Sequence, residues 1–150
     1  MTLTLGRGDW EYRLLDTASA ATFRMGSIVK LGGARTVIEM TSFVTDTHLL
    51  GIALHNSVDS TPAGKVLVAI PTENCTAFAP TGAIAQSAVS VGQALTFEKS
   101  GNTFSQITTS GVTKHAVVVG PIINTSTRSI IEISFLGDAL QFYSNATNVI

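Results

Sequence analysis

Short apolar runs broken by turn residues constrain this chain more than any other feature of its sequence. The runs are rich in Val, Ile, Thr and Phe, and Gly, Asn, Ser and Pro separate them, which is typical of β-strands joined by tight turns. No segment has the spacing of apolar residues that an amphipathic helix requires. The predicted strands are Ser27–Leu31, Thr36–Thr41, Leu49–Leu54, Lys65–Ile70, Ala94–Glu98, Phe104–Thr108, Ala116–Val119 and Ser129–Phe135. Many short strands of this kind predict an all-β fold, a compact barrel or a sandwich.

Two local patterns refine this prediction. Gly32-Gly33 and Ser100-Gly101-Asn102 are expected to form hairpin turns, because Gly and Asn tolerate a positive φ. In the last predicted strand apolar and polar residues alternate, which places Ile131 and Ile133 on a buried face and Glu132 on the opposite, solvated face.

The predicted strands follow each other twice in the same order, which indicates two pseudo-repeated halves at about 23–71 and 89–136. Gly51 aligns with Gly120 in this comparison, and a Gly within a strand often marks a bulge or sharp bend. The matched segments are Met25–Leu31 with Val91–Phe97, Leu49–Leu54 with Val118–Ile123, and Lys65–Ile70 with Ser129–Phe135. Chance similarity between β-rich segments is the alternative.

The length of 150 residues fits one domain, or two very small ones that share a core. We expect a β-barrel domain at 23–136, an extended N-terminal arm at 1–22 and a C-terminal tail at 137–150. The stretch from Thr72 to Ser90 is rich in Ala, Thr, Ser and Gly and could be an ordered surface loop or a subunit contact, and its low charge favours the contact.

The composition indicates a protein that is covered by partners. Charged residues make up 13% of the chain, against about 25% in an ordinary soluble domain, and the mean hydropathy is +0.35. The longest apolar runs, such as Val66–Ile70, are far too short for a membrane-spanning helix, so we expect no membrane association. Contacts with other subunits explain the apolar surface better.

The charges and termini exclude other classes. The formal net charge is −1 and the basic residues are scattered, so no nucleic-acid partner is expected. The N-terminus lacks the features of a secretory signal, and the single Cys75 excludes an internal disulfide.

A search for chemistry gives no catalytic, cofactor-binding or metal-binding residues. The spacing of His48, His55 and His115 matches no metal motif. Cys75 has no base nearby in sequence, which favours a buried structural thiol over a nucleophile. We therefore expect that the protein is not an enzyme and needs no cofactor.

The N-terminal segment contains the candidate partner-binding residues Trp10, Tyr12, Leu14 and Leu15. Large aromatic side chains anchor interfaces because they bury much area with few rotamers to freeze. Strand alternation would place Trp10, Tyr12 and Leu14 on one side and Leu15 on the other. The segment could add a strand to the sheet of a neighbouring molecule, or it could close the chain's own barrel.

The segments Gly26-Ser27-Ile28-Val29, Leu50-Gly51-Ile52-Ala53 and Lys65-Val66-Leu67-Val68 resemble the lambda-type capsid decoration, or cement, proteins of tailed phages. The resemblance covers roughly residues 23–136 and consists of glycines and apolar strands. The chain departs from the shortest members of that family in its second half and in its C-terminal tail, Gln141–Ile150.

The resemblance implies a β-tulip-like subunit that binds the major capsid protein on the outer surface of the virion and stabilises the expanded shell. It also implies a homotrimer, an N-terminal arm that engages the capsid or a neighbouring subunit, and synthesis in the host cytoplasm. Two other classes stay open. One is a trimeric β-fold enzyme with its site between subunits, and the other is a different virion, tail or carbohydrate-binding component.

Overall fold

The computed structural model describes residues 3–17, 24–32, 36–40, 48–56, 64–72, 74–80, 90–100, 104–108, 114–125 and 128–140. Within them the chain forms eleven strands and one short 3-10 helix, so the all-β class is confirmed. The elements are β1 Thr4–Leu5, β2 Glu11–Asp16, β3 Ile28–Leu31, β4 Val37–Glu39, β5 Gly51–Ala53, β6 Lys65–Ile70, β7 Thr76–Pro80, β8 Ala94–Ser100, β9 Phe104–Thr108, β10 Ala116–Thr125, β11 Arg128–Phe135 and η3 Gly137–Ala139. Each of the eight predicted strands is present.

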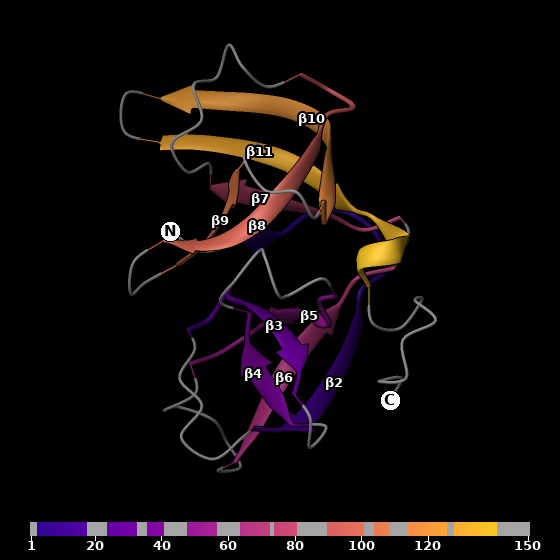
Figure 1. Cartoon of the computed structure of the whole chain (residues 1–150), viewed down its shortest axis with the longest axis vertical. Coiled ribbons are helices and arrows are strands. Elements are labelled where there is room, and N and C mark those ends of the chain that lie inside the picture. The colour runs from indigo at the N-terminus through magenta and orange to yellow at the C-terminus, as the bar shows by residue number, and fades with distance from the viewer. Residues whose placement is uncertain are drawn as a thin grey trace.

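The strands form two antiparallel sheets that lie one beyond the other along the longest axis of the molecule (Figure 1). The five-stranded sheet has the order β2-β6-β5-β3-β4, and the six-stranded sheet has the order β1-β7-β11-β10-β8-β9. If β1 is set aside, the two orders correspond strand for strand: β7 takes the place of β2, and β8 to β11 take the places of β3 to β6. The first half of the chain therefore has the same topology as the second half.

Individual backbone hydrogen bonds repeat as well. The N–H of Gly26 donates to the carbonyl of Ala53 (2.7 Å), and the N–H of Gly92 donates to the carbonyl of Val118 (2.8 Å). Gly26 and Gly92 have φ values of 86° and 91°, a region that favours glycine. Each half thus enters its first hairpin through the same glycine turn, which makes Gly26 and Gly92 equivalent positions.

The structure corrects the predicted alignment at one point. Gly51 pairs with Val29 in β3, and Ala116 pairs with Leu95 in β8, so the equivalent of Gly51 is Ala116. The predicted match to Gly120 is wrong by four positions. The sequence comparison was misled by a glycine with a different role, because Gly120 lies where the register of β10 shifts against β11.

The repeat also begins earlier than predicted. Arg13 in β2 pairs with Val68, and Ala77 in β7 pairs with Ile133 at the equivalent register. The segments predicted as an arm (1–22) and as a loop or subunit contact (72–90) therefore contain the opening strands of the two halves. β7 contains two alanines and ends at Pro80, residues that disfavour strands, and it takes this conformation by pairing on both sides.

The five-stranded sheet curls until its edges meet at one point. Thr17, directly after β2, forms an isolated parallel bridge with Val37 in β4. In the described residues the ladder does not continue around the sheet, so both sheets are open. The closed barrel stays a prediction.

Two clusters of buried side chains hold the fold. The first-half core lies within the curled five-stranded sheet and contains Val29, Leu31, Val37, Leu50, Ala53, Val66, Val68 and Ile70. The shared core joins the halves: its residues from the first half include Ile28 and Ile52, and those from the second half include Phe97, Ile133 and Phe135. A common core makes the two halves one domain.

The start of the predicted C-terminal tail belongs to this domain. Ala139 and Leu140 are buried, and the N–H of Leu49 donates to the carbonyl of Ala139 (2.8 Å). Residues 141–150 lie outside the described residues. In the part of the chain that is described, no helix has the length and apolarity to cross a membrane.

Candidate interaction surfaces

Tyr12 and Leu14 project from β2, a strand at the edge of the five-stranded sheet. Their exposed fractions are 55% and 48%. No described strand pairs with the outer edge of β2. We call this pair of side chains the β2 surface.

The other two candidate residues contribute to the interior of the molecule instead. Trp10 is half-buried and packs edge-on against Phe135, with ring centroids 5.8 Å apart and an interplanar angle of 87°. Leu15 packs against the first-half core. The structure therefore brings Tyr12 and Leu14 together on the surface and separates Trp10 and Leu15 from them.

The described part of the N-terminal segment is no free arm. β1 pairs with β7, placing Thr4 opposite Phe78, and β2 pairs with β6 over its whole length. Of the two interpretations of residues 1–22, pairing within the chain's own sheets is what residues 3–17 show. The physical reason is that Leu3 and Leu15 gain burial only against the chain's own cores.

A second group of exposed apolar side chains lies beside the glycine turns. Met25 precedes Gly26 and is 57% exposed, and its equivalent Val91 precedes Gly92 and is 71% exposed. Val119, at the end of the β10 segment that pairs with β8, is 37% exposed. We call Val91 and Val119 the turn surface. The sequence pattern did not predict this surface, although Met25 and Val91 stand at aligned positions.

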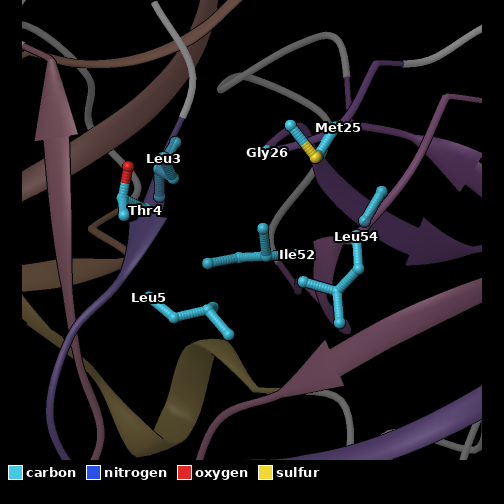
Figure 2. Close-up of a pocket in the computed structure, with 8 residues that line it drawn as sticks. Leu3, Thr4, Leu5, Met25, Gly26, Ile52 and Leu54 are labelled. Carbon is cyan, nitrogen blue, oxygen red and sulfur yellow. The ribbon is translucent and has the colours of Figure 1, made fainter.

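An apolar hollow of about 280 Å³ lies between β1 and the first glycine turn. Figure 2 shows Leu3 and Leu5 on one side and Met25, Ile52 and Leu54 on the other. None of its lining residues titrates, so it offers no acid or base for catalysis.

The candidate chemical residues have structural partners. His115 is buried, and its Nδ1 accepts a hydrogen bond from the backbone N–H of Phe97 (3.1 Å). The Nε2 of His55 accepts one from the N–H of Leu67 (2.9 Å). Cys75 is a free, buried thiol, and its Sγ accepts from the N–H of Thr72 (3.3 Å). Among the described residues, no three His, Cys, Asp or Glu side chains are grouped to hold a metal ion.

Glu132 was predicted to lie on a solvated face of the last strand, but it is buried. Only 5% of it is exposed, and its Oε1 accepts from Nε (3.1 Å) and Nη2 (2.9 Å) of Arg7. The loop after β1 is held on β7, since the N–H of Arg7 donates to Thr76 Oγ1 (2.9 Å), and this places the guanidinium over the carboxylate. Simple alternation failed because the Arg7 guanidinium binds Glu132 and the backbone of β10 at Gly120 lies against its side chain.

This ion pair predicts an effect on stability. Arg7→Ala should lower the free energy of unfolding by about 1–2 kcal/mol, because it leaves a buried carboxylate without its charged partner. The expected loss is smaller than for a fully buried ion pair, because the Arg7 side chain is 76% exposed and water screens its charge. Urea unfolding at neutral pH measures the loss.

The repeat supplies the control. In the first half Leu67 of β6 pairs with Leu14, and in the second half Glu132 of β11 pairs with Phe78 at the equivalent register. Leu67 is therefore the first-half equivalent of Glu132. The double variant Arg7→Ala/Glu132→Leu should recover most of the lost stability, since it removes both charges and leaves an apolar side chain. If the double variant were less stable than Arg7→Ala, burial of an unpaired charge would not be the cause.

Comparison with known proteins adds no relative to this picture. The chain matches no protein-family model, and neither the curated proteins nor the solved structures gave a match.

Proposed function

We propose that the protein is a structural component of a phage virion that binds the outer surface of the capsid as a homotrimer and stabilises the expanded shell. The observation that carries this proposal is the bare apolar surface of a chain with only 13% charged residues. Tyr12, Leu14, Val91 and Val119 are exposed, and apolar side chains grouped in pairs on the surface can be buried by a partner. The resemblance of residues 23–136 to decoration proteins supplies the partner.

The proposed mechanism is mechanical. Each subunit bridges neighbouring capsid proteins and opposes the outward pressure of packaged DNA. One contact of this kind can be weak, because a subunit that is held at several points of a lattice binds with the combined strength of all its contacts. The rigid two-half domain suits this role, since a shared core transmits force between its ends.

Binding to shells tests the proposal directly. The purified chain should sediment with expanded capsid shells and raise their disruption temperature in calorimetry, and it should bind unexpanded shells much more weakly. Binding to neither kind of shell at saturating concentration would contradict the proposal.

A point variant tests the β2 surface in the same assay. Tyr12→Asp should weaken binding to shells at least tenfold, because loss of an aromatic anchor weakens a direct contact with the capsid and equally weakens a contact between subunits that lets several of them bind the lattice together. Met25→Asp is the matched control, since Met25 is exposed to the same degree (57% against 55%) and should bind as the wild type does. Deletion of residues 1–22 is unsuitable, because it removes strands from both sheets.

A further inference from the structure

One contact inside the chain joins its two halves, and β1 makes it. β1 pairs with β7 at the edge of the six-stranded sheet. From there the N–H of Leu3 donates to the carbonyl of Gly26 (3.1 Å), and the side chains of Leu3 and Leu5 face the first glycine turn across the apolar hollow (Figure 2). The second half thus presents an edge, and the first half presents its glycine turn.

The turn side of this contact is more deeply buried in the first half than in the second, although Met25 itself stays 57% exposed. Ile28 and Ile52 are fully buried in the shared core. At the equivalent positions Ala94 and Val117 are only half-buried, and beside them the turn surface is exposed. The carbonyl of Gly26 accepts a hydrogen bond from the N–H of Leu3, whereas within the described ranges no backbone N–H donates to the carbonyl of Gly92.

The edge side shows the opposite distribution. In the second half β1 covers the edge of β7, and Thr76 is only 8% exposed. Tyr12 on β2 is the equivalent of Thr76 on β7. Tyr12 pairs with Ala69 in β6, and Thr76 pairs with Ser134 at the same register in β11. Tyr12 is 55% exposed, and β2 has no described counterpart of β1. The edge of β2 and the second glycine turn therefore lack the cover that β1 gives to their equivalents, the edge of β7 and the first glycine turn.

We propose that copies of this protein associate head to tail, with the turn surface of one copy (Val91 and Val119) packed against the β2 surface of the next (Tyr12 and Leu14). Two different patches meet in this contact, so each added copy leaves one patch of each kind open until a ring closes. This inference deepens the self-association in the proposed function by naming its surfaces, and it requires no capsid.

The charges near the β2 surface suit burial. Arg13 and Glu11 form an ion pair (2.6 Å), and Lys65 pairs with Asp16. Neighbouring charges are therefore compensated within the subunit, and an incoming apolar side chain does not strand an isolated charge. A central aromatic residue with a charged rim is the usual anatomy of an interface.

Mass measurement of the chain alone tests the inference. The wild type should form a discrete oligomer at micromolar concentration, at least twice the monomer mass of 15.7 kDa. Val91→Asp should shift it to monomer. Met25→Asp, the same change at the equivalent turn of the first half, should leave the oligomer intact, because a carboxylate at this exposed position can face solvent and β1 already donates to the neighbouring Gly26 carbonyl. A monomeric wild type, or equal loss in both variants, would overturn the inference.

Mixing variants tests the head-to-tail arrangement itself. Val91→Asp keeps an intact β2 surface, and Tyr12→Asp keeps an intact turn surface. Each should be monomeric alone, whereas an equimolar mixture should form a heterodimer of twice the monomer mass. A mixture that stays monomeric would overturn the head-to-tail contact. Val119→Asp replaces Val91→Asp if that variant fails the circular-dichroism test of folding.

The two proposals fail separately. A chain that forms the oligomer and the complementing heterodimer but ignores shells keeps this inference and loses the capsid function. A chain that binds shells while every form is monomeric keeps the capsid function and loses this inference.

Discussion

Phe97→Ala should lower the free energy of unfolding by about 3–5 kcal/mol, the usual cost of deleting a buried Phe side chain. Phe97 is 1% exposed and lies in the shared core. Its ring centroid lies 5.9 Å from that of Phe135 and 5.8 Å from that of His115. Alanine would leave a cavity where the two halves meet. Since small domains have about 5–15 kcal/mol of total stability, urea unfolding should show a large shift.

The first half supplies the control for this variant. Leu31 follows Gly26 by five positions as Phe97 follows Gly92, so Leu occupies the equivalent position. Phe97→Leu should cost only about 1–1.5 kcal/mol, because most of the buried volume is retained. Equal losses for Ala and Leu would mean that the ring contacts with Phe135 and His115 matter more than the filled volume.

The sequence predicted most of the fold because most strands carry their own local signal. Lys65–Ile70 is an uninterrupted run closed by Pro71, and the structure has a strand over the same residues. β7 has no such signal, since its two alanines disfavour a strand, and it depends on pairing with both β1 and β11. β1 has only two residues, too few for any periodic pattern. The missed strands are those that tertiary pairing creates.

The candidate surface was predictable only in part. Alternation placed Tyr12 and Leu14 on one side of a strand, and both are exposed. The same rule placed Trp10 with them, but β2 begins at Glu11 and Trp10 instead packs on Phe135. Ile28 and Ala94 occupy equivalent strand positions, and only the arrangement of the two halves decides that Ile28 is buried while Ala94 is half-buried. The sequence alone therefore does not show which of the two glycine turns is less covered.

The second large effect is expected at Gly51. An alanine Cβ there would collide with the carbonyl oxygen of Ala69 and would lie 3.0 Å from the carbonyl carbon. These are backbone atoms of β6, so a side-chain rotation cannot relieve the contact and the pairing of β5 with β6 must shift. Gly51→Ala should therefore cost about 3 kcal/mol, the upper part of the range for an overpacked core, measured by urea unfolding.

Gly137→Ala is the matched control, since nothing lies within 4 Å of its Cβ position and its φ is not positive. It should be neutral or should stabilise the fold by about 0.4–1 kcal/mol, because alanine restricts the unfolded chain. The second half has Ala116 at the position of Gly51 and buries it completely. The halves therefore share a topology but differ in the spacing of these strands, and only the first half requires glycine. Equal free energies of unfolding for Gly51→Ala and Gly137→Ala would show that Ala69 does not approach β5 this closely. The two sheets would then be equivalent in strand spacing as well as in strand order.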